Sequence, residues 1–259
     1  MFENISLMTY GRCVKRKGWW IQDSIGINRI YYIHSGNVLF RSGMIEKMLE
    51  AGKSYLFPQN LQFELVTDEH TCVDHTFIDF TTVPPIKMDD VVELTACQES
   101  LNNSAWRVLM EIIEAYPMFP DYQRNKFYNT TKAYLRGLLE IMDETAGLGT
   151  IDEPIISETL NYIHRNFHND ISITDLAEKF NYHVNFFIKK FKKYMNMTPY
   201  QYIVRYRLNT AINLLRQNTY TVSEVAELVG YSSVSSFSHT FKKLYGIYPS
   251  ELSDDFELV

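Results

Sequence analysis

The chain has 259 residues, 46% of them hydrophobic, so it is long enough for two globular domains with separate cores. Its formal net charge of −6 excludes a uniformly basic coat for nucleic acid. Cys13, Cys72 and Cys97 lie far apart without CxxC spacing, which argues against a disulfide framework or structural zinc and favours a reducing cytoplasm.

Residues 5–80 are predicted to form many short strands, because runs of aromatic and β-branched residues alternate with turn residues. The strand-like runs are Trp19–Ile21, Arg29–His34, Val38–Phe40, Ser54–Pro58, Gln62–Val66 and Thr76–Phe80. Ser35-Gly36-Asn37 predicts a hairpin between the second and third of these runs. The regular spacing of the runs indicates a β-sandwich or a β-barrel.

After Pro84-Pro85 the apolar residues recur every three or four positions, which predicts helices. The recurring residues are Trp106, Leu109, Met110 and Ile113, then Tyr134, Leu135, Leu138, Leu139 and Met142. These helices could cover the open side of the barrel, form a dimer interface, or do both. Residues 145–153 are predicted to be a linker, and Pro154 opens another helix, with an apolar stripe at Ile156, Leu160, Ile163 and Phe167.

From residue 172 to residue 252 one pattern is written twice, with an offset of 49 in its first part and 50 in its later part. Each copy has a helix start, an apolar pair, a turn, and a second helix with two phenylalanines four residues apart. These are Phe187 and Phe191 in the first copy and Phe237 and Phe241 in the second. Such pairs pack a helix on the core and leave its opposite face for another molecule.

Local signals support helix-turn-helix units. Ser172-x-x-Asp175 and Thr221-x-x-Glu224 are typical of helix starts, where a hydroxyl and a carboxylate satisfy exposed backbone N–H groups. Gly230, and Asn181 in the first copy, suit the left-handed turn that ends a first helix.

These features resemble the AraC/XylS family of bacterial transcription regulators. The second copy ends in the family's Phe-Lys-Lys-x-x-Gly-x-x-Pro pattern, from Phe241 to Pro249. The helix between the copies carries the family's Tyr202, Arg207, Ala211, Leu214 and Leu215. The chain departs from the pattern at Asn181, where the family usually has Gly, and at His183, where it usually has a Ser or Thr cap.

The segments Tyr31–Gly36 and Ala51–Pro58 resemble the cupin-like sensor domain that precedes the DNA-binding half in many family members. The resemblance implies an α+β protein, with an N-terminal cupin-like β-barrel and flanking helices followed by an all-α half. The expected domains are an effector-binding and dimerisation domain at 1–144, a linker at 145–153, and a tandem helix-turn-helix domain at 154–253.

The charge distribution agrees with DNA binding by the second half. Residues 153–253 hold 11 Lys and Arg against 8 Asp and Glu, whereas residues 1–152 hold 14 against 20. By the family pattern, the residues expected to contact bases are Asn185, Ile188 and Lys189 in the first copy and Ser235, Ser238 and His239 in the second. Phosphate contacts are expected from Ser172, Lys192, Lys193, Thr221, Lys242 and Lys243.

The barrel is expected to hold a small-molecule effector, for which a few polar groups among aromatics would suit a sugar. The candidates are Trp19, Trp20, Arg29, Tyr31, His34, Tyr55 and Phe57. Alternation along 29–34 places Arg29, Tyr31 and Ile33 on one face and Ile30, Tyr32 and His34 on the other, and either face could line the cavity.

The resemblance implies a DNA-binding regulator, more commonly an activator, with double-stranded DNA, RNA polymerase and a second copy of the chain as partners. One alternative is a ligand-independent regulator whose barrel only dimerises. Another is a metal-dependent cupin enzyme fused to DNA-binding helices, although His34, His70 and His75 lack the usual His-x-His spacing. We expect no cofactor, no metal and no catalytic residue. Met1–Asn4 lacks the basic start of a signal peptide, and no run approaches a membrane helix, so a cytoplasmic, nucleoid-associated protein is expected.

Overall fold

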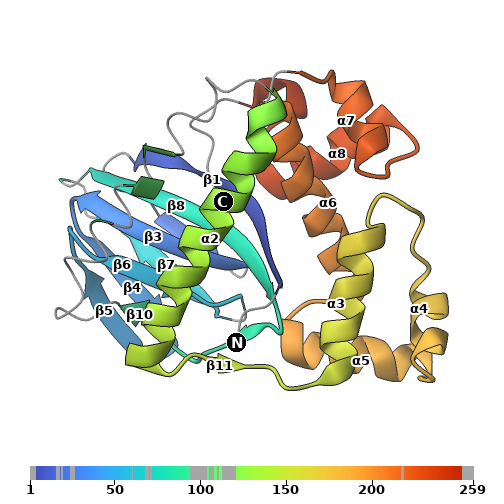
Figure 1. Ribbon diagram of the computed structural model, residues 1–259, viewed down its shortest axis with the longest axis horizontal. Coiled ribbons are helices and arrows are strands. Elements are labelled where there is room, and N and C mark those ends of the chain that lie inside the picture. The colour runs from blue at the N-terminus through green and yellow to red at the C-terminus, as the bar shows by residue number, and fades with distance from the viewer. Residues whose placement is uncertain are drawn as a thin grey trace. The chain divides into compact units, whose positions relative to one another are not determined.

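The computed structural model describes residues 4–15, 18, 20–23, 27–59, 61–67, 70, 72–93, 104, 108–109, 111–112, 121–216 and 219–252. The chain divides into two compact units, residues 1–150 and a unit that begins at Ile151 (Figure 1). The first combines β-sheets with a long helix and the second is built from helices, which confirms the predicted α+β class. Within the described residues, no helix has both the length and the apolar character needed to span a bilayer.

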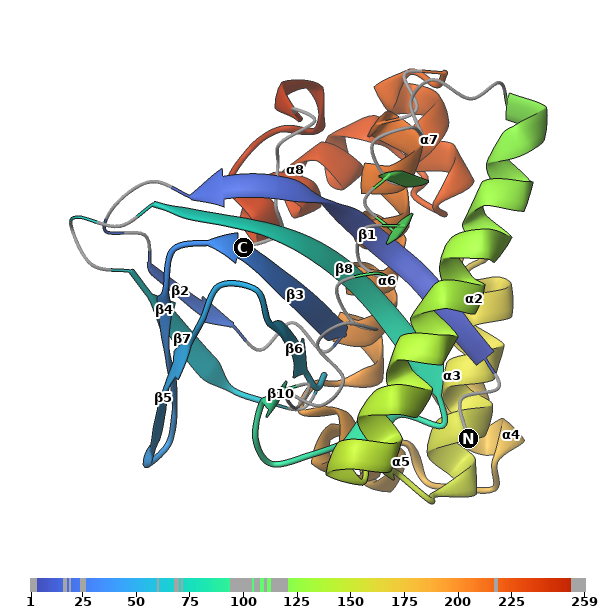
Figure 2. The same cartoon turned by 60° about the vertical axis from the view of Figure 1, so that its left-hand side comes forward.

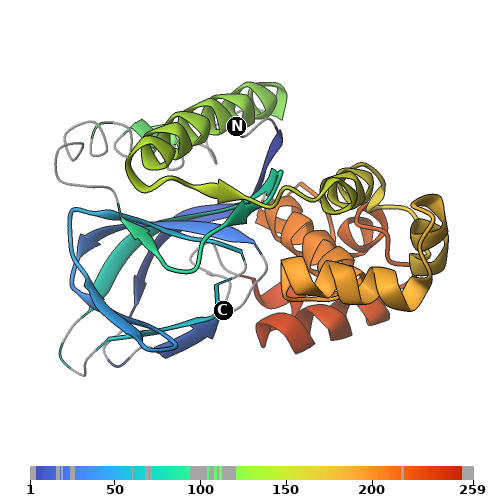
Figure 3. The same cartoon turned by 90° about the horizontal axis from the view of Figure 1, so that it is seen from below.

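Two antiparallel sheets make up most of the first unit. The five-stranded sheet has the order β1 (Asn4–Lys15), β8 (Val73–Val83), β3 (Asn28–Ser35), β6 (Ser54–Phe57) and β10 (Val92–Glu93). The four-stranded sheet has the order β2 (Trp20–Asp23), β7 (Phe63–Val66), β4 (Val38–Ser42) and β5 (Ile45–Leu49). The sheets face each other (Figure 3), and we call the two sheets and the core between them the barrel.

An aromatic core fills the space between the two sheets. The five-stranded sheet contributes Tyr31, Ile33, Tyr55, Phe57 and Phe77, and the other sheet contributes Val38, Phe40, Leu49, Phe63 and Leu65. All ten side chains are at most 5% exposed. The alternation along β3 is therefore settled: Arg29, Tyr31 and Ile33 face the barrel core, and Ile30 faces the other way.

The prediction of a hairpin at residues 35–37 is wrong. Strands β3 and β4 follow each other in sequence but belong to different sheets, so the turn between them is a corner of the barrel. Gly36 adopts a φ of 84°, and a Cβ at this position would lie 2.3 Å from the Cys72 carbonyl oxygen. The turn residues marked a tight change of direction, but they carried no information about which strand pairs with which.

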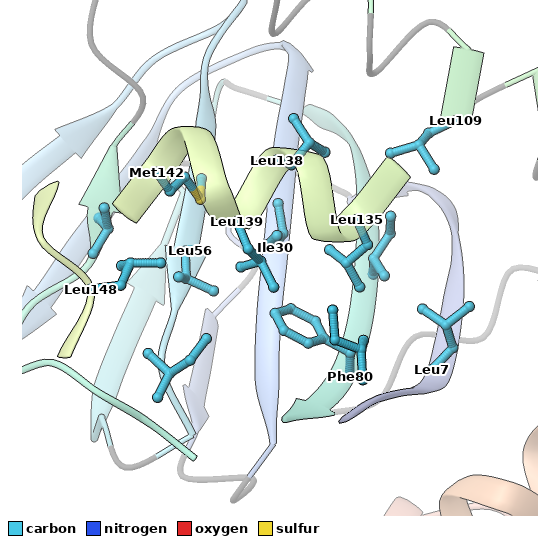
Figure 4. Close-up of a cluster of buried hydrophobic side chains, with 14 residues drawn as sticks. Leu7, Ile30, Leu56, Phe80, Leu109, Leu135, Leu138, Leu139, Met142 and Leu148 are labelled. Atoms are coloured by element: carbon cyan, nitrogen blue, oxygen red, sulfur yellow. The ribbon is translucent and has the colours of Figure 1, made fainter. Parts of the chain in front are cut away.

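Helix α2 (Asp121–Ala146) packs on the five-stranded sheet, on the side away from the barrel core (Figure 2). Its buried stripe consists of Leu135, Leu138, Leu139 and Met142, which lie against Ile30, Leu56 and Phe80 of the sheet (Figure 4). Leu109 joins this cluster, whereas Tyr134 is 38% exposed. The helix thus covers the outer face of the five-stranded sheet rather than an open side of the barrel. Trp106, Met110 and Ile113 lie outside the described residues.

Part of the segment predicted as a linker is paired. Strand β11 (Gly149–Thr150) pairs antiparallel with β9 (Ile86–Lys87), and Leu148 is buried in the cluster beneath α2. Strand pairing in the first unit therefore continues to residue 150, four residues before α3 begins at Pro154.

The second unit contains six helices among its described residues. They are α3 (Pro154–Asn166), α4 (Ile173–Lys179), α5 (Val184–Met195), α6 (Pro199–Arg216), α7 (Val222–Leu228) and α8 (Val234–Tyr245), followed by a 3₁₀ turn at Pro249–Glu251. Helices α4 and α5 form the first predicted helix-turn-helix copy, α7 and α8 form the second, and α6 joins them.

Candidate nucleic-acid interface

The turn between α4 and α5 is closed by local contacts. The Ser172 hydroxyl accepts a hydrogen bond from the Asp175 N–H at 3.2 Å, which starts α4. Asn181 adopts the left-handed conformation, with a φ of 58°, as the sequence predicted. The His183 side chain takes the place of the expected Ser or Thr cap, because its Nδ1 accepts from the Asn185 N–H at 3.3 Å.

The turn between α7 and α8 closes in the same way with stronger caps. Thr221 and Glu224 form a complete capping box, whereas the shorter Asp175 leaves α4 with one half of it. The Thr221 N–H and hydroxyl donate to the Glu224 carboxylate and hold its pKa below the usual value. Gly230 supplies the left-handed turn at a φ of 86°, and Ser233 caps α8.

The two turn residues give a matched test of backbone strain. Asn181→Gly should raise the free energy of unfolding of the second unit by about 0.5–1 kcal/mol, because glycine adopts a positive φ without steric cost. Gly230→Ala should lower it, since its Cβ would lie 2.7 Å from the His168 carbonyl oxygen. Guanidinium unfolding of both variants, followed by circular dichroism, measures the two changes in the free energy of unfolding. Changes of the same sign would contradict this account.

Helix α6 is held to its neighbours by polar contacts, one of them from the family-pattern residue Arg207. The Arg207 guanidinium donates to the carbonyl oxygens of Phe167 at 2.6 Å and Asn169 at 2.7 Å, just after α3. The Tyr245 hydroxyl at the end of α8 donates to Asn209 of α6. On the side of the first copy, the ring of Tyr202 on α6 lies 5.9 Å from that of Phe191 on α5. Helix α6 therefore contacts both α5 and α8.

The predicted base-contacting residues lie on the solvent side of α5 and α8. Asn185, Lys189, Ser235 and His239 are exposed, and Ile188 and Ser238 are partly exposed. Phe187, Phe191, Phe237 and Phe241 occupy the opposite faces and are at most 1% exposed. Each helix therefore packs on the core through its two phenylalanines, and its predicted base-contacting residues lie on the opposite side.

The predicted phosphate contacts are also exposed. Ser172 and Thr221 lie at the first turns of α4 and α7, and Lys192, Lys193, Lys242 and Lys243 lie in the last turns of α5 and α8. Lys242 Nζ lies 3.8 Å from the centre of the Tyr248 ring, and Lys193 Nζ lies 5.3 Å from that of Tyr194. These contacts orient the two ammonium groups without burying them.

One ion pair on α5 was not predicted. Lys190 Nζ lies 3.0 Å from the carboxylate of Glu153, which also accepts from the Tyr194 hydroxyl at 3.2 Å. This hydrogen-bonded carboxylate raises the pKa of Lys190. Glu153 is the last residue before α3, so this ion pair ties the start of α3 to α5. No sequence signal marked this pair, because its partners lie 37 positions apart.

The barrel brings together four of the seven effector candidates. Arg29, Tyr31, Tyr55 and Phe57 are each at most 1% exposed. The Arg29 guanidinium pairs with both carboxylate oxygens of Asp79, at 2.6 and 3.0 Å, and donates to the Tyr31 hydroxyl at 3.3 Å. Burial raises the pKa of Tyr55 to about 12. The interior thus holds one paired cation among aromatic rings.

The other three effector candidates are not part of this cluster. His34 is partly exposed and bonds Thr76, and its ring lies 4.9 Å from that of Tyr32, which packs against the core beneath α2. Trp19 lies outside the described residues, and of Trp20 only the backbone, in β2, is described. Within the described ranges, no group of three His, Cys, Asp or Glu residues is placed to hold a metal ion.

Known proteins resemble this chain in its repeated helix-turn-helix region and in its overall fold. A helix-turn-helix domain family matches residues 176–255. A protein of Photobacterium leiognathi named "Probable transcriptional regulator LumQ" is 39% identical over 90 residues, which is 35% of this chain and 36% of LumQ. The chain therefore matches about a third of the length of that relative.

Two further similarities extend over most of the chain. The Msm operon regulatory protein of Streptococcus mutans is 22% identical over 218 residues, covering 81% of this chain and 77% of that protein. The crystal structure of unsaturated fatty acid-bound ToxT from Vibrio cholerae superposes with a TM-score of 0.62 at 16% identity, covering 97% of this chain and 96% of ToxT. At this identity the likeness establishes a shared two-domain fold.

Proposed function

Because the chain is identified as an AraC-type transcription regulator by its helix-turn-helix half and by the fold of its whole length, we propose that it binds double-stranded DNA through α5 and α8 together. The main observation behind this proposal is that α5 and α8 have equivalent exposed faces. Each helix packs on the core through two buried phenylalanines, and α6 connects the two copies. A helix presented in this way enters a major groove. One chain would then contact two adjacent groove segments, about 34 Å apart.

Selection from random-sequence duplexes with the full chain tests this function. The expected result is an enriched site with two blocks of preferred bases about one helical turn apart, bound more weakly as salt rises. Chemical footprinting of the selected site should show both blocks protected. Enrichment of no sequence, or of one block alone, would contradict binding through both helices.

Lys189 is proposed to contact a base. Lys189→Ala should weaken binding of the selected site by about 1–3 kcal/mol and relax the preference at one position of the first block. Lys192→Ala is the matched control. Loss of a phosphate contact should weaken binding to all sequences alike and should reduce the slope of log K against log salt concentration by about one. Titration of both variants on matched and mutated duplexes measures this. A uniform loss for Lys189→Ala would make it a phosphate contact.

We further propose that a small molecule bound in the barrel controls DNA binding. The support is the buried Arg29 with the hydroxyls of Tyr31 and Tyr55, which are polar groups among aromatics and would suit a sugar. The fatty acid bound to ToxT makes an acidic amphiphile the second class to test. Ligand would bind one arrangement of the chain better and so shift its population. From the resemblance to the family we also propose an activator role, contact with RNA polymerase, dimerisation through the first unit, and a place on the cytoplasmic nucleoid.

Thermal unfolding of the full chain against sugars, organic acids, amino-acid derivatives and unsaturated fatty acids tests ligand control. A ligand at a hundred times its Kd adds about 2.7 kcal/mol of stability, which is several degrees in Tm. A saturable shift with one class would establish a sensor and name its ligand class.

One observation favours the alternative, a regulator whose barrel only dimerises. The interior rings pack on one another, with centroids of Phe57 and Phe63 at 4.8 Å, Tyr31 and Phe57 at 5.1 Å, and Phe40 and Phe57 at 6.0 Å. The chain's own side chains therefore occupy this part of the interior. A dimer in sedimentation experiments, together with no shift from any ligand class, would support the alternative.

A further inference from the structure

Phe186 is a large apolar side chain on the solvent side of the first recognition helix. It is 53% exposed, although the next residue, Phe187, is 1% exposed. Its ring lies almost parallel to that of Tyr182, with centroids 5.3 Å apart and an interplanar angle of 9°. Lys190 Nζ lies 5.5 Å from the centre of the same Tyr182 ring. Phe186 therefore stacks on Tyr182 while about half of its surface stays exposed.

Phe186 neighbours Asn185 and Lys189, two of the three predicted base contacts, on the solvent side of α5. At 3.6 residues per turn, Asn185, Phe186 and Lys189 all fall on the side opposite the buried Phe187 and Phe191. Asn185 and Phe186 lie on either side of Lys189, about 40° and 60° around the helix, whereas Ile188 lies about 160° from Phe186. Phe186 is therefore next to Lys189 on the solvent side of the helix, where a duplex that Lys189 contacts would approach.

The second copy of the motif is built differently at the same place. Ser236 occupies the position of Phe186, and its backbone N–H and carbonyl bond Ser233 and Thr240 within α8. Tyr231, the counterpart of Tyr182, packs at 5.4 Å on the core residue Phe237, with the Arg207 guanidinium 5.8 Å from its ring. Tyr231 thus packs on a buried ring in the second copy, whereas Tyr182 stacks on the exposed ring of Phe186 in the first.

A phenyl ring offers no hydrogen bond, so it can distinguish base pairs only by apolar contact. The apolar group on the major-groove edge of a standard base pair is the 5-methyl group of thymine. We propose that Phe186 is a specificity-determining residue that recognises thymine through this methyl group, in the block contacted by α5. This inference rests on the proposed DNA binding, and it adds a residue beyond the set that the family pattern predicts.

Replacement of single thymines by deoxyuridine in the selected site tests the inference, because it removes the methyl group and leaves the hydrogen bonds of the pair unchanged. The full-length wild-type chain should bind about fourfold more weakly when the critical thymine of the first block is replaced, since a buried methyl contributes about 0.8 kcal/mol. Phe186→Ala should bind the thymine and deoxyuridine duplexes equally at that position.

Two further variants give the test its controls. Phe186→Leu keeps an apolar side chain and should retain part of the discrimination, which shows that a loss in Phe186→Ala does not come from misfolding. Ser236→Ala changes the equivalent position of α8 and should leave the discrimination in the first block intact.

The outcomes separate this inference from the proposed function. If the chain selects a two-block site but no thymine of the first block responds to deoxyuridine, or if Phe186→Ala still discriminates as the wild type does, Phe186 does not recognise thymine. A uniform loss of affinity in Phe186→Ala, with the discrimination kept, would place the ring against the sugar-phosphate backbone and overturn the inference. Failure to select any site would reject the proposed function itself.

Discussion

Arg29→Met is expected to lower the free energy of unfolding of the first unit by about 3–5 kcal/mol. The variant removes the counter-charge of Asp79, which is 0% exposed and has no access to water. In the wild type this carboxylate accepts from the Arg29 guanidinium through both oxygens and from the Thr9 hydroxyl at 2.6 Å. After the change, the Thr9 bond alone would remain of these contacts.

Tryptophan fluorescence during guanidinium unfolding of the full chain measures this loss selectively, because Trp19, Trp20 and Trp106 all belong to the first unit. The double variant Arg29→Met/Asp79→Leu should recover most of the stability, since an apolar pair of similar size carries no buried charge. A single variant as stable as the wild type would mean that water reaches Asp79. A double variant that stays destabilised would mean that packing, rather than charge, is lost.

The same pair of variants bears on the proposed effector. If a ligand from the thermal-unfolding panel stabilises the wild type but not the well-folded double variant, the buried charges contribute to its binding. If both respond alike, the ligand binds elsewhere, and the Arg29–Asp79 pair is a structural feature of the core. The stability measurement and the ligand measurement therefore separate two roles that burial alone does not distinguish.

The helix-turn-helix half was predictable from sequence because its determinants are local. The caps at Ser172 and Thr221, the left-handed turns at Asn181 and Gly230, and the buried Phe pairs all act within a few residues of one another. Even the unusual cap at His183 is a contact between residues two apart. Periodicity and cap chemistry contain this information, so reasoning along the chain recovers it.

The barrel was predictable in its strands but not in its pairing. Each of the six strand-like runs overlaps a strand, but the sequence reasoning missed β1 and β5 as well as the short strands β9, β10 and β11. It also paired β3 with β4, which lie in different sheets. Alternation along β3 divided its residues correctly into two sets but did not say which set faces inward. That choice depends on Asp79, fifty residues later, which supplies the counter-charge that allows Arg29 to be buried.

Phe186 shows a second limit of sequence reasoning. Adjacent residues of a helix can both be buried, as Tyr202 and Ile203 of α6 are, so the pair of phenylalanines does not by itself show that one of them is exposed. The repeat supplies this signal, because Phe187 aligns with the buried Phe237 and Phe186 aligns with Ser236. The stacking of Phe186 on Tyr182 needed the structure, since the equivalent Tyr231 turns toward the core.

Acidification should destabilise the second unit through His164. This histidine of α3 lies against α6, with Nε2 2.8 Å from the Tyr202 hydroxyl and its ring stacked 4.4 Å from that of Tyr206. Burial lowers the pKa of His164 from 6.5 to about 4. Between these two values the unfolded chain binds a proton that the folded chain does not, so the stability contribution is complete above pH 6.5 and falls toward pH 4. The expected loss is about 2–3 kcal/mol.

Hydrogen exchange of α6 amides in the full chain, measured across this pH range and corrected for the intrinsic exchange rate, tests the effect. His164→Gln should lower stability at neutral pH, because ring stacking is lost, but should flatten its dependence on pH between 4 and 6.5. His168→Gln, at an exposed position four residues later, controls for the loss of a histidine as such. An unchanged slope in His164→Gln would assign the pH dependence to other groups. A flattened slope would show that the contact between α3 and α6, which also positions Arg207, requires a neutral imidazole.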